Sequence, residues 1–505
     1  MKQADSPKPY KLPIIHPSHL KNWFSIFPTA LGIWLLLITL IRIYFLYNNH
    51  LDLYADEAQY YDWSKDLAFG YYSKPPMIAL MIKISCLIFG DHEAGVRLFS
   101  PILHLLTSIN IYFIARKLYN EKIGCYSSII YLTFPAITLS SALITTDPIL
   151  LFFWSITSLF FIYELWIWAG IAFGLGLLTK YNMVIFIPSA MIYLYYKHKN
   201  FIPKAVGELD LILSGERTEC TKKYMSTRIH DKIKNQFFKC EGYIWLKNPS
   251  IYLSVLIGLL IYSPNFIWNL NHGFVSYLHT KEISQIEKYS VSFTKMIEFL
   301  LAQIAIIGPV MSLIVIRSFR NIKSHKLVSS LFLPIFLFTL FLSFISNAYG
   351  NWAAPAYVFL SIFIASSKRF LNFAIISNIL ISILLYCYPL YEDKLPIDPY
   401  KRIRGWSDLG KQVSMISSLH PDALIISDDR KIIAELIYYT KSKDKIRKYN
   451  PTRNIRDHYD MTISVDHIAK EAILVFKKPT SELFSHCQER YAHNNANICY
   501  IIPNY

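Results

Sequence analysis

Residues 24–46 read FSIFPTALGIWLLLITLIRIYFL, an almost unbroken apolar run that Arg42 interrupts near its end. About 20 apolar residues are enough for a helix to cross the hydrocarbon core of a membrane. No small-residue cleavage site follows a short apolar core here, as it would in a removed signal peptide. We therefore interpret this stretch as a retained membrane anchor.

Further apolar blocks follow along the chain. Of its 505 residues, 53% are hydrophobic and 16% aromatic, which is too apolar for a few ordinary soluble domains. An odd number of crossings, about eleven, is predicted, so the two termini are expected on opposite sides of the membrane. Met77–Phe89 has instead the length of an interfacial or re-entrant helix. The ten crossings predicted after the first are Val96–Ala115, Ile123–Leu143, Ile149–Tyr163, Trp166–Leu178, Met183–Tyr196, Ile251–Trp268, Met296–Ile316, Leu327–Ile345, Ala354–Ala365 and Leu371–Pro389.

Clusters of lysine and arginine orient these crossings. All of them fall in loops that are expected on one side, and the positive-inside rule makes that side cytoplasmic. The net charge of +16 is then mostly membrane-orienting, and its spread over separate loops argues against a nucleic-acid-binding face. The protein is therefore expected in the inner (cytoplasmic) membrane with its N-terminus in the cytoplasm. The regions expected outside are loop 47–76, Thr145–Asp147, loop 270–295, Asn347–Trp352 and the C-terminal tail.

Two domains are predicted, a membrane domain over residues 1–390 and an extracytoplasmic C-terminal domain over residues 391–505. The tail contains apolar runs typical of strands and one segment with helical spacing, so a small α/β domain is expected there. The predicted fold class is thus mainly α, a polytopic membrane protein with a small C-terminal α/β domain. The strand-like runs are Ala423–Ser427, Ala472–Phe476 and Cys499–Ile502, and the helical segment is Arg430–Thr440.

Two features of the chain stand apart from this pattern. Phe201–Glu241 is polar and mixed in charge, and we interpret it as a cytoplasmic insertion or mobile loop. The seven cysteines form no CxxC pair. Cys487 and Cys499 are both expected outside the cytoplasm, where disulfides form, so either a bridge between them or two buried thiols fits the sequence.

The outer loop 47–76 carries the acidic stretch YADEAQYYDWSKDLAFGYYSKPP at residues 54–76. Asp56 and Glu57 are adjacent there, at the level of the lipid headgroups, and we predict that they are catalytic; solvated surface charge is the alternative. Asp147, in ITTDPIL at the outer mouth of two crossings, is a third catalytic candidate, because ionisable residues at the boundary of a membrane bundle are often functional. Its alternative role is a helix N-cap before proline.

Cationic and aromatic side chains near these acids are candidates for binding a substrate. Lys74, Lys180 and Arg97 are predicted near the outer surface, where a cation can neutralise a phosphate. The alternatives are snorkelling for the two lysines and an ion pair with an acidic residue for Arg97. Tyr60 and Tyr61 can stack on a sugar ring, or they belong to the ordinary aromatic belt of the interface.

These residue types together point to sugar transfer. A carboxylate deprotonates an acceptor hydroxyl, whose oxygen attacks an activated sugar carbon while a cation holds the leaving lipid phosphate. The chain contains no GxSxG motif, no P-loop and no Rossmann glycine pattern. Hydrolytic triads, ATP-driven transport and hydride transfer therefore have no support in the sequence.

The stretch DEAQYYDWSKDLAFGYYSKPPMIALMIKISCLIFGDHEAGVRL resembles the N-terminal signature of bacterial glycosyltransferase family 39. This is the dolichyl-phosphate-mannose–protein mannosyltransferase-like group, which includes the aminoarabinose transferases that modify lipid A. TTDPILLFFW, GLGLLTKYNMVIFIP, NWAAPAY and RIRGWSDLG match further motifs in order, so the resemblance covers most of residues 31–413. It implies a membrane fold of type GT-C and a polyprenyl-phosphate sugar donor.

By the same resemblance, Asp56 is the catalytic base with Glu57 beside it. Asp147 matches a second outer acidic position of the site. Lys74 matches a lysine that contacts the lipid phosphate in the aminoarabinose-transferase branch, and Trp352 matches a position that lines the site or packs the outer domain on the bundle.

The sequence departs from that branch at Ser73, where relatives carry a glutamate that helps hold a metal. No bound metal and no other cofactor is therefore expected.

The favoured hypothesis is an inverting glycosyltransferase that acts on the outer face of the membrane. Its acceptor is lipid A, another envelope glycan or lipid, or a protein, and neither the sugar nor the acceptor follows from the residues. A transporter or lipid flippase that uses the outer acidic residues for coupling is the alternative, although no internal repeat occurs. A non-catalytic scaffold explains least, because it needs no acidic pair near Lys74.

Overall fold

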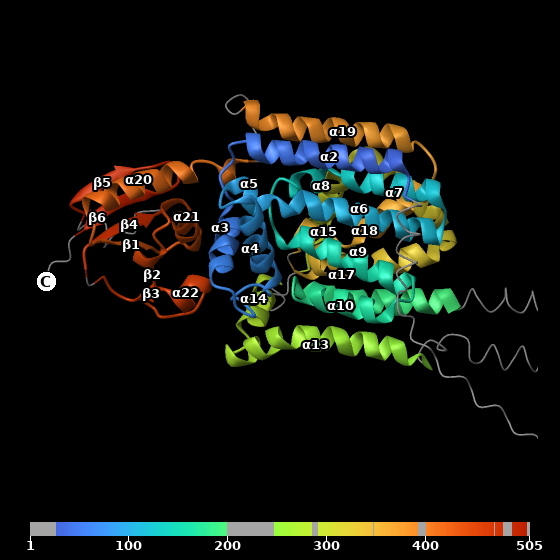
Figure 1. Ribbon diagram of the computed structural model, residues 1–505, viewed down its shortest axis with the longest axis horizontal. Coiled ribbons are helices and arrows are strands. Elements are labelled where there is room, and N and C mark those ends of the chain that lie inside the picture. Colours follow the sequence, from blue (N-terminus) through green and yellow to red (C-terminus); the bar gives the residue numbers. More distant parts are fainter. Residues whose placement is uncertain are drawn as a thin grey trace, which may run out of the picture.

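The computed structural model describes residues 27–198, 247–284, 291–346, 348–391, 400–468, 470–477 and 487–501. The predicted insertion Phe201–Glu241 and the basic residues before the first crossing lie outside this part of the chain. Helices run side by side along one axis, and a sheet with its own helices lies at one end of them (Figure 1). The chain is mainly helical, as predicted, and its described strands all belong to the C-terminal part.

The helical part begins with α2 (Thr29–Asn48) and ends with α19 (Leu371–Cys387) and η5 (Tyr388–Tyr391). The elements between them are α3 (Ala55–Lys65), α4 (Met77–Phe89), α5 (Glu93–Arg97), α6 (Phe99–Leu118), α7 (Glu121–Thr133), α8 (Pro135–Ser140), α9 (Thr146–Ile162), α10 (Trp166–Leu177), η1 (Tyr181–Ile185), α13 (Pro249–Asn271), α14 (Val275–Ser284), α15 (Phe293–Ile307), α16 (Pro309–Ser318), η3 (Phe319–His325), α17 (Lys326–Ile345), η4 (Gly350–Ala353) and α18 (Ala356–Ser366). Residues 186–198 are also helical.

Within the described ranges, four helical stretches are long and apolar enough to cross a membrane. They are Thr29–Asn48, Glu93–Leu118, Pro249–Asn271 and Pro309–Ile345. Shorter apolar helices of 10–17 residues accompany them, among them α9, α10, α18 and α19. By length and composition alone the structure thus marks fewer crossings than the sequence predicts. Met77–Phe89, predicted as a short interfacial or re-entrant helix, is α4.

Two predicted crossings are interrupted in the structure. Ile123–Leu143 divides into α7 and α8, because Pro135 begins a new helix. Met296–Ile316 divides into α15 and α16 at Gly308, whose φ of +93° lies in the left-handed region and which precedes Pro309. Proline has no backbone N–H to continue the preceding helix in either place.

Burial separates the core of the bundle from its rim. α18 is buried from Ala356 to Ala365, whereas α2, α13 and α19 expose large apolar side chains such as Leu37, Leu260 and Leu384. Outer faces of this kind suit contact with lipid. Small residues allow α13 to approach α10 closely, because a Cβ on Gly170 would lie 2.4 Å from the carbonyl oxygen of Ser254.

The C-terminal part contains a six-stranded sheet in the order β3-β2-β1-β4-β6-β5. β1 pairs in parallel with β2 and β4, and β6 is antiparallel to both β4 and β5. β4 is buried along its length, as expected of a continuous apolar strand inside a sheet. The elements are η6 (Lys401–Ile403), α20 (Trp406–Leu419), β1 (Leu424–Ser427), α21 (Arg430–Thr440), η7 (Lys443–Lys445), β2 (Ile446–Tyr449), α22 (His458–Thr462), β3 (Ser464–Val465), β4 (Ala472–Phe476), β5 (Glu489–Ala492) and β6 (Asn497–Ile501).

A disulfide joins Cys487 to Cys499 of β6. Of the two alternatives that the sequence leaves open for these cysteines, the bridge is therefore the one that the structure contains. It ties the segment before β5 to the strand that pairs with it.

The acidic outer loop lies where the two parts of the molecule meet. α3 lies between the sheet region and the long helices, and α21 packs against it (Figure 1). The amide of Leu53 donates to the Tyr439 hydroxyl on α21 at 2.9 Å, and the amide of Met77 donates to the carbonyl of Leu178 at the end of α10 at 3.0 Å. The loop is thus held from both sides, by the C-terminal region and by the bundle.

Candidate active site

The two adjacent acids, Asp56 and Glu57, have different surroundings because they lie in the first turn of α3. Successive helical residues point about 100° apart around the axis. Glu57 turns inward and is fully buried, and its Oε2 accepts the amide of Tyr54 at 2.8 Å, which caps the helix. Asp56 remains partly open, with 34% of its side chain exposed.

Glu57 forms a buried ion pair with Arg97. The guanidinium Nη2 lies 2.7 Å from Glu57 Oε2, and Nε lies 3.0 Å from Oε1. Arg97 also donates to the carbonyls of Leu51 and Asp52, and the amide of Ile144 donates to Glu57 Oε1 at 2.7 Å. Both side chains are almost completely removed from solvent.

This burial argues against two of the predicted roles. Glu57 has both oxygens occupied and no open face toward a substrate, so it is not placed to act as a catalytic carboxylate. Arg97 is held in the same way and is not placed to bind a phosphate. The structure matches the alternative raised for Arg97, an ion pair with an acidic residue, and the pair joins loop 47–76 to the turn before α9.

Asp56 is held from the C-terminal region. Both Nη1 and Nη2 of Arg430 lie 3.1 Å from Asp56 Oδ1, and Nη1 also donates to Gln59 Oε1 at 2.6 Å. Within the described part of the chain, Asp56 Oδ2 has no hydrogen-bond donor. One carboxylate oxygen is therefore fixed, and the other is available to a substrate.

Asp147 and Lys180, which were predicted separately, meet in the structure. Lys180 Nζ lies 2.8 Å from Asp147 Oδ1, and Asn351 Nδ2 donates to Oδ2 at 2.7 Å. Thr145, not Asp147, caps α9, since its hydroxyl accepts the amide of Asp147. Because both of its oxygens are engaged, Asp147 is better placed to hold Lys180 and Asn351 than to accept a proton.

Lys74 is the cation at this site with no anionic partner among the described residues. Burial, followed by the nearby Lys180 ammonium, lowers the pKa of Lys74 to about 8, although the Asp56 and Asp147 carboxylates oppose the shift. A group with these neighbours lies within electrostatic reach of both acids. An anion that bound here would gain the interaction that Lys74 lacks.

The predicted aromatic residues divide between the site and its support. Burial and the carboxylates of Asp56 and Asp147 raise the pKa of Tyr60 well above its ordinary value, which places Tyr60 near both acids. Tyr61 is buried against Tyr438 of α21 and lies under the Lys441 ammonium, so it contacts the C-terminal region instead. Trp352 is partly buried and packs on Tyr349, next to the Asn351 that holds Asp147.

Two residues near the site were not anticipated from the sequence. Arg430 is 374 positions from Asp56, and nothing in its local pattern distinguishes it from a helical surface arginine. His279 of α14 packs against Tyr72 at 4.8 Å between ring centroids, and its Nδ1 is buried without a partner among the described residues. Burial and the nearby Lys74 cation lower the pKa of His279 to about 4, so the imidazole is neutral.

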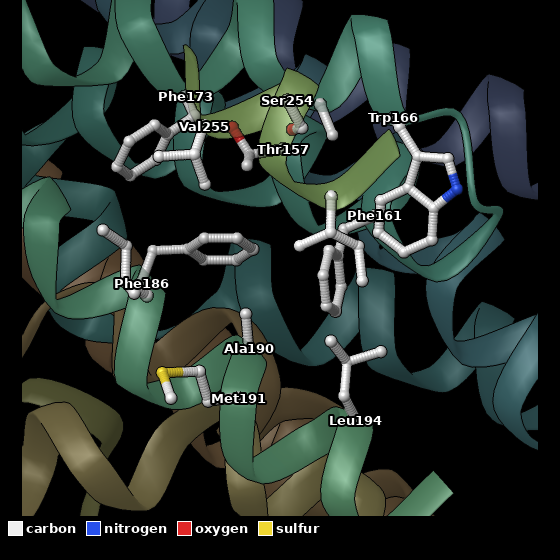
Figure 2. Close-up of a pocket in the computed structure, with 13 residues that line it drawn as sticks. Thr157, Phe161, Trp166, Phe173, Phe186, Ala190, Met191, Leu194, Ser254 and Val255 are labelled. Atoms are coloured by element: carbon white, nitrogen blue, oxygen red, sulfur yellow. The ribbon is translucent and has the colours of Figure 1, made fainter. Parts of the chain in front are cut away.

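Neither a metal site nor the apolar cavity of the bundle belongs to this cluster of charged residues in the part of the chain that the structure describes. In the described ranges, no three His, Cys, Asp or Glu side chains are grouped so that they could hold a metal ion, and the expectation that none is bound stays a prediction. An apolar cavity lies between α9, α10, the helix at 186–198 and α13, where Phe161, Phe186 and Trp166 point into it (Figure 2). None of the site's charged residues lines it.

Comparison with known proteins places these features in context. Residues 73–213 match the family model described as dolichyl-phosphate-mannose-protein mannosyltransferase. The lipid A galacturonosyltransferase RgtD of Rhizobium johnstonii is 26% identical over 424 residues, which cover 79% of this chain and 80% of that protein. An undecaprenyl phosphate-alpha-4-amino-4-deoxy-L-arabinose arabinosyl transferase of Pseudomonas fluorescens is 28% identical over 135 residues, 24% of each chain.

The fold has a solved counterpart. ArnT from Cupriavidus metallidurans, bound to undecaprenyl phosphate, aligns over 94% of this chain and 98% of its own with a TM-score of 0.59 and 12% identity. The long apolar helices, together with the likeness to this ArnT structure, are typical of a multi-pass membrane protein. Family model and relatives together support a glycosyltransferase related to the lipid A sugar transferases, and its fold is similar to that of ArnT.

Proposed function

We propose that the protein moves a sugar from a polyprenyl-phosphate-linked donor onto an acceptor of the cell envelope. Its relatives include sugar transferases named for lipid A and for an undecaprenyl phosphate donor, and its fold is that of ArnT. Lipid A is the favoured acceptor on this ground, ahead of another envelope glycan or lipid and of a protein. The open carboxylate oxygen of Asp56, within electrostatic reach of Lys74, which has no anionic partner among the described residues, is the observation that carries the proposal.

We place the site on the outer face of the inner membrane. In this arrangement about eleven crossings bring the N-terminus to the cytoplasm and the C-terminal domain to the outside. The disulfide between Cys487 and Cys499 supports that side, because such bridges persist in oxidising compartments. The same end of the bundle carries α3, Asp147 and Lys180, so donor and acceptor would meet beneath the C-terminal domain.

Transfer would take place in one displacement. Asp56 Oδ2 accepts the proton of an acceptor hydroxyl, and that oxygen forms a bond to the anomeric carbon of the sugar. The bond from this carbon to the phosphate oxygen breaks, and its electron pair leaves with the polyprenyl phosphate. Asp56 then releases the proton to water. A single displacement from the opposite face inverts the anomeric configuration.

The cations stabilise the leaving phosphate. Lys74 supplies a point charge, and its attraction to the departing oxygen strengthens as negative charge develops there. Lys180, held by Asp147, is the second cation at this side of the site. Tyr60 lies near both acids, where its ring can contact the sugar.

The proposal is tested with purified protein in nanodiscs that contain a lipid extract of the source membranes. Polyprenyl-phosphate-sugar species are followed by mass spectrometry with time. The proposal predicts that one donor species disappears while free polyprenyl phosphate appears, and the mass lost identifies the sugar. Transport without chemistry would leave every donor mass unchanged in the presence of acceptor, and that result would contradict the proposal.

A further inference from the structure

Positively charged side chains of the C-terminal region contact the acidic loop. α21 begins at Arg430, after Asp429 has capped its first turn by accepting the amide of Lys431 at 2.7 Å. The first residue of the helix faces α3, where it contacts Asp56 and Gln59. Arg430 therefore comes to lie against Asp56 as a consequence of how α21 starts.

Arg430 makes a specific set of contacts on α3. Both of its terminal nitrogens donate to Asp56 Oδ1, at 3.1 Å each, and Nη1 also donates to Gln59 Oε1 at 2.6 Å. Asp56 and Gln59 are three residues apart and so lie on the same face of the helix. About a third of each side chain of the Arg430–Asp56 pair is exposed, so the pair is open to an incoming hydroxyl.

Other contacts hold the C-terminal region on α3. Lys443 Nζ lies 2.7 Å from Asp62 and 2.6 Å from Asp66. Lys441 lies over the Tyr61 ring, and the Tyr439 hydroxyl accepts the amide of Leu53. Docking of α21 therefore has several supports besides Arg430.

We propose that Arg430 is a positioning residue for Asp56, an inference that rests on the proposed function. The guanidinium fixes Oδ1 and leaves Oδ2 turned toward the acceptor. The C-terminal domain thus completes the site at the end of the membrane bundle.

The test measures the initial rate of donor consumption against donor concentration for Arg430→Gln, Arg430→Lys and the control Lys431→Gln. Lys431 is the next residue on α21, and its side chain is exposed. Loss of positioning predicts that kcat falls about ten- to a hundredfold in Arg430→Gln, while KM for the donor changes less than about twofold. Arg430→Lys regains part of the rate because the charge remains, and Lys431→Gln behaves as wild type.

Three results would overturn the inference while the proposed function stands. Wild-type kcat in Arg430→Gln would show that Asp56 does not need the guanidinium. A raised KM with unchanged kcat would make Arg430 a donor ligand instead. Hydrogen exchange of the α21 amides is measured in parallel, and faster exchange along the whole helix in Arg430→Gln would assign Arg430 to docking. A wild-type protein that consumes no donor would instead contradict the proposed function itself.

Discussion

The carboxylate of Glu57 and the guanidinium of Arg97 form an ion pair of 2.7 Å, and both side chains are inaccessible to solvent. Removing one partner leaves the other charge buried without compensation, which typically costs about 3–5 kcal/mol. We expect Glu57→Gln to lower the unfolding temperature markedly in detergent, while molecules that remain folded keep most of their activity per molecule.

Fluorescence-detected size exclusion after graded heating measures this loss. The double variant Glu57→Gln with Arg97→Met removes both charges and should recover part of the stability. A well-folded Glu57→Gln protein without activity would instead restore Glu57 as a catalytic residue.

The lowered pKa of Lys74 predicts that binding of the donor depends on pH. Its pKa of about 8 means that the ammonium loses its proton as the pH rises through 8. Binding of an anionic phosphate needs the charged form, so kcat/KM for the donor should fall above pH 8. Lys74→Arg keeps its charge to higher pH and should move that fall upward. An identical alkaline limb in both proteins would rule out Lys74 as the group that binds the phosphate.

Glu435 predicts a pH dependence of stability. It is buried in α21, and neither of its carboxyl oxygens has a hydrogen-bond partner in the described part of the chain. Burial, followed by the Glu57 carboxylate, raises its pKa well above the ordinary value of 4.5. The folded protein therefore binds a proton that the unfolded chain has already released above pH 4.5. Stability falls as the pH rises from there toward the folded pKa.

Glu435→Gln stays neutral and should remove this decline. Thermal unfolding from pH 4 to 9 is compared for the wild type, Glu435→Gln and the exposed control Asp422→Asn. Parallel curves for all three proteins would show that Glu435 carries no such proton.

The part of the site that the sequence predicts follows from topology. Asp56, Lys74, Asp147 and Lys180 belong to segments expected on the same side of the membrane, and the structure brings them together. Asp147 and Lys180 form an ion pair, although each was predicted from a separate motif. The apolar blocks likewise predict most of the helices, because an apolar run of sufficient length has one favourable state in a membrane.

What the sequence did not predict depends on orientation and on long-range packing. Asp56 and Glu57 look equivalent as neighbours in the sequence. In a helix they point about 100° apart, so Asp56 stays partly exposed while Glu57 enters a buried ion pair. Arg430 reaches Asp56 only because α21 docks on α3, a contact between segments 374 residues apart. The helix breaks at Pro135 and Gly308 lie inside two predicted crossings. Each crossing was predicted as one continuous helix because the residues on both sides of the break are apolar.

The central claim is that Asp56 is the base, and the most direct measurement compares Asp56→Asn with Asp66→Asn. Both change one acid of the same α3 region to an amide of equal size. Asp66 is 78% exposed, and its carboxylate forms an ion pair with Lys443. Single-turnover transfer from bound donor is followed by mass spectrometry. We predict that Asp56→Asn loses at least about a hundredfold in rate with donor still bound, while Asp66→Asn stays near wild type. Wild-type turnover in Asp56→Asn would contradict the account.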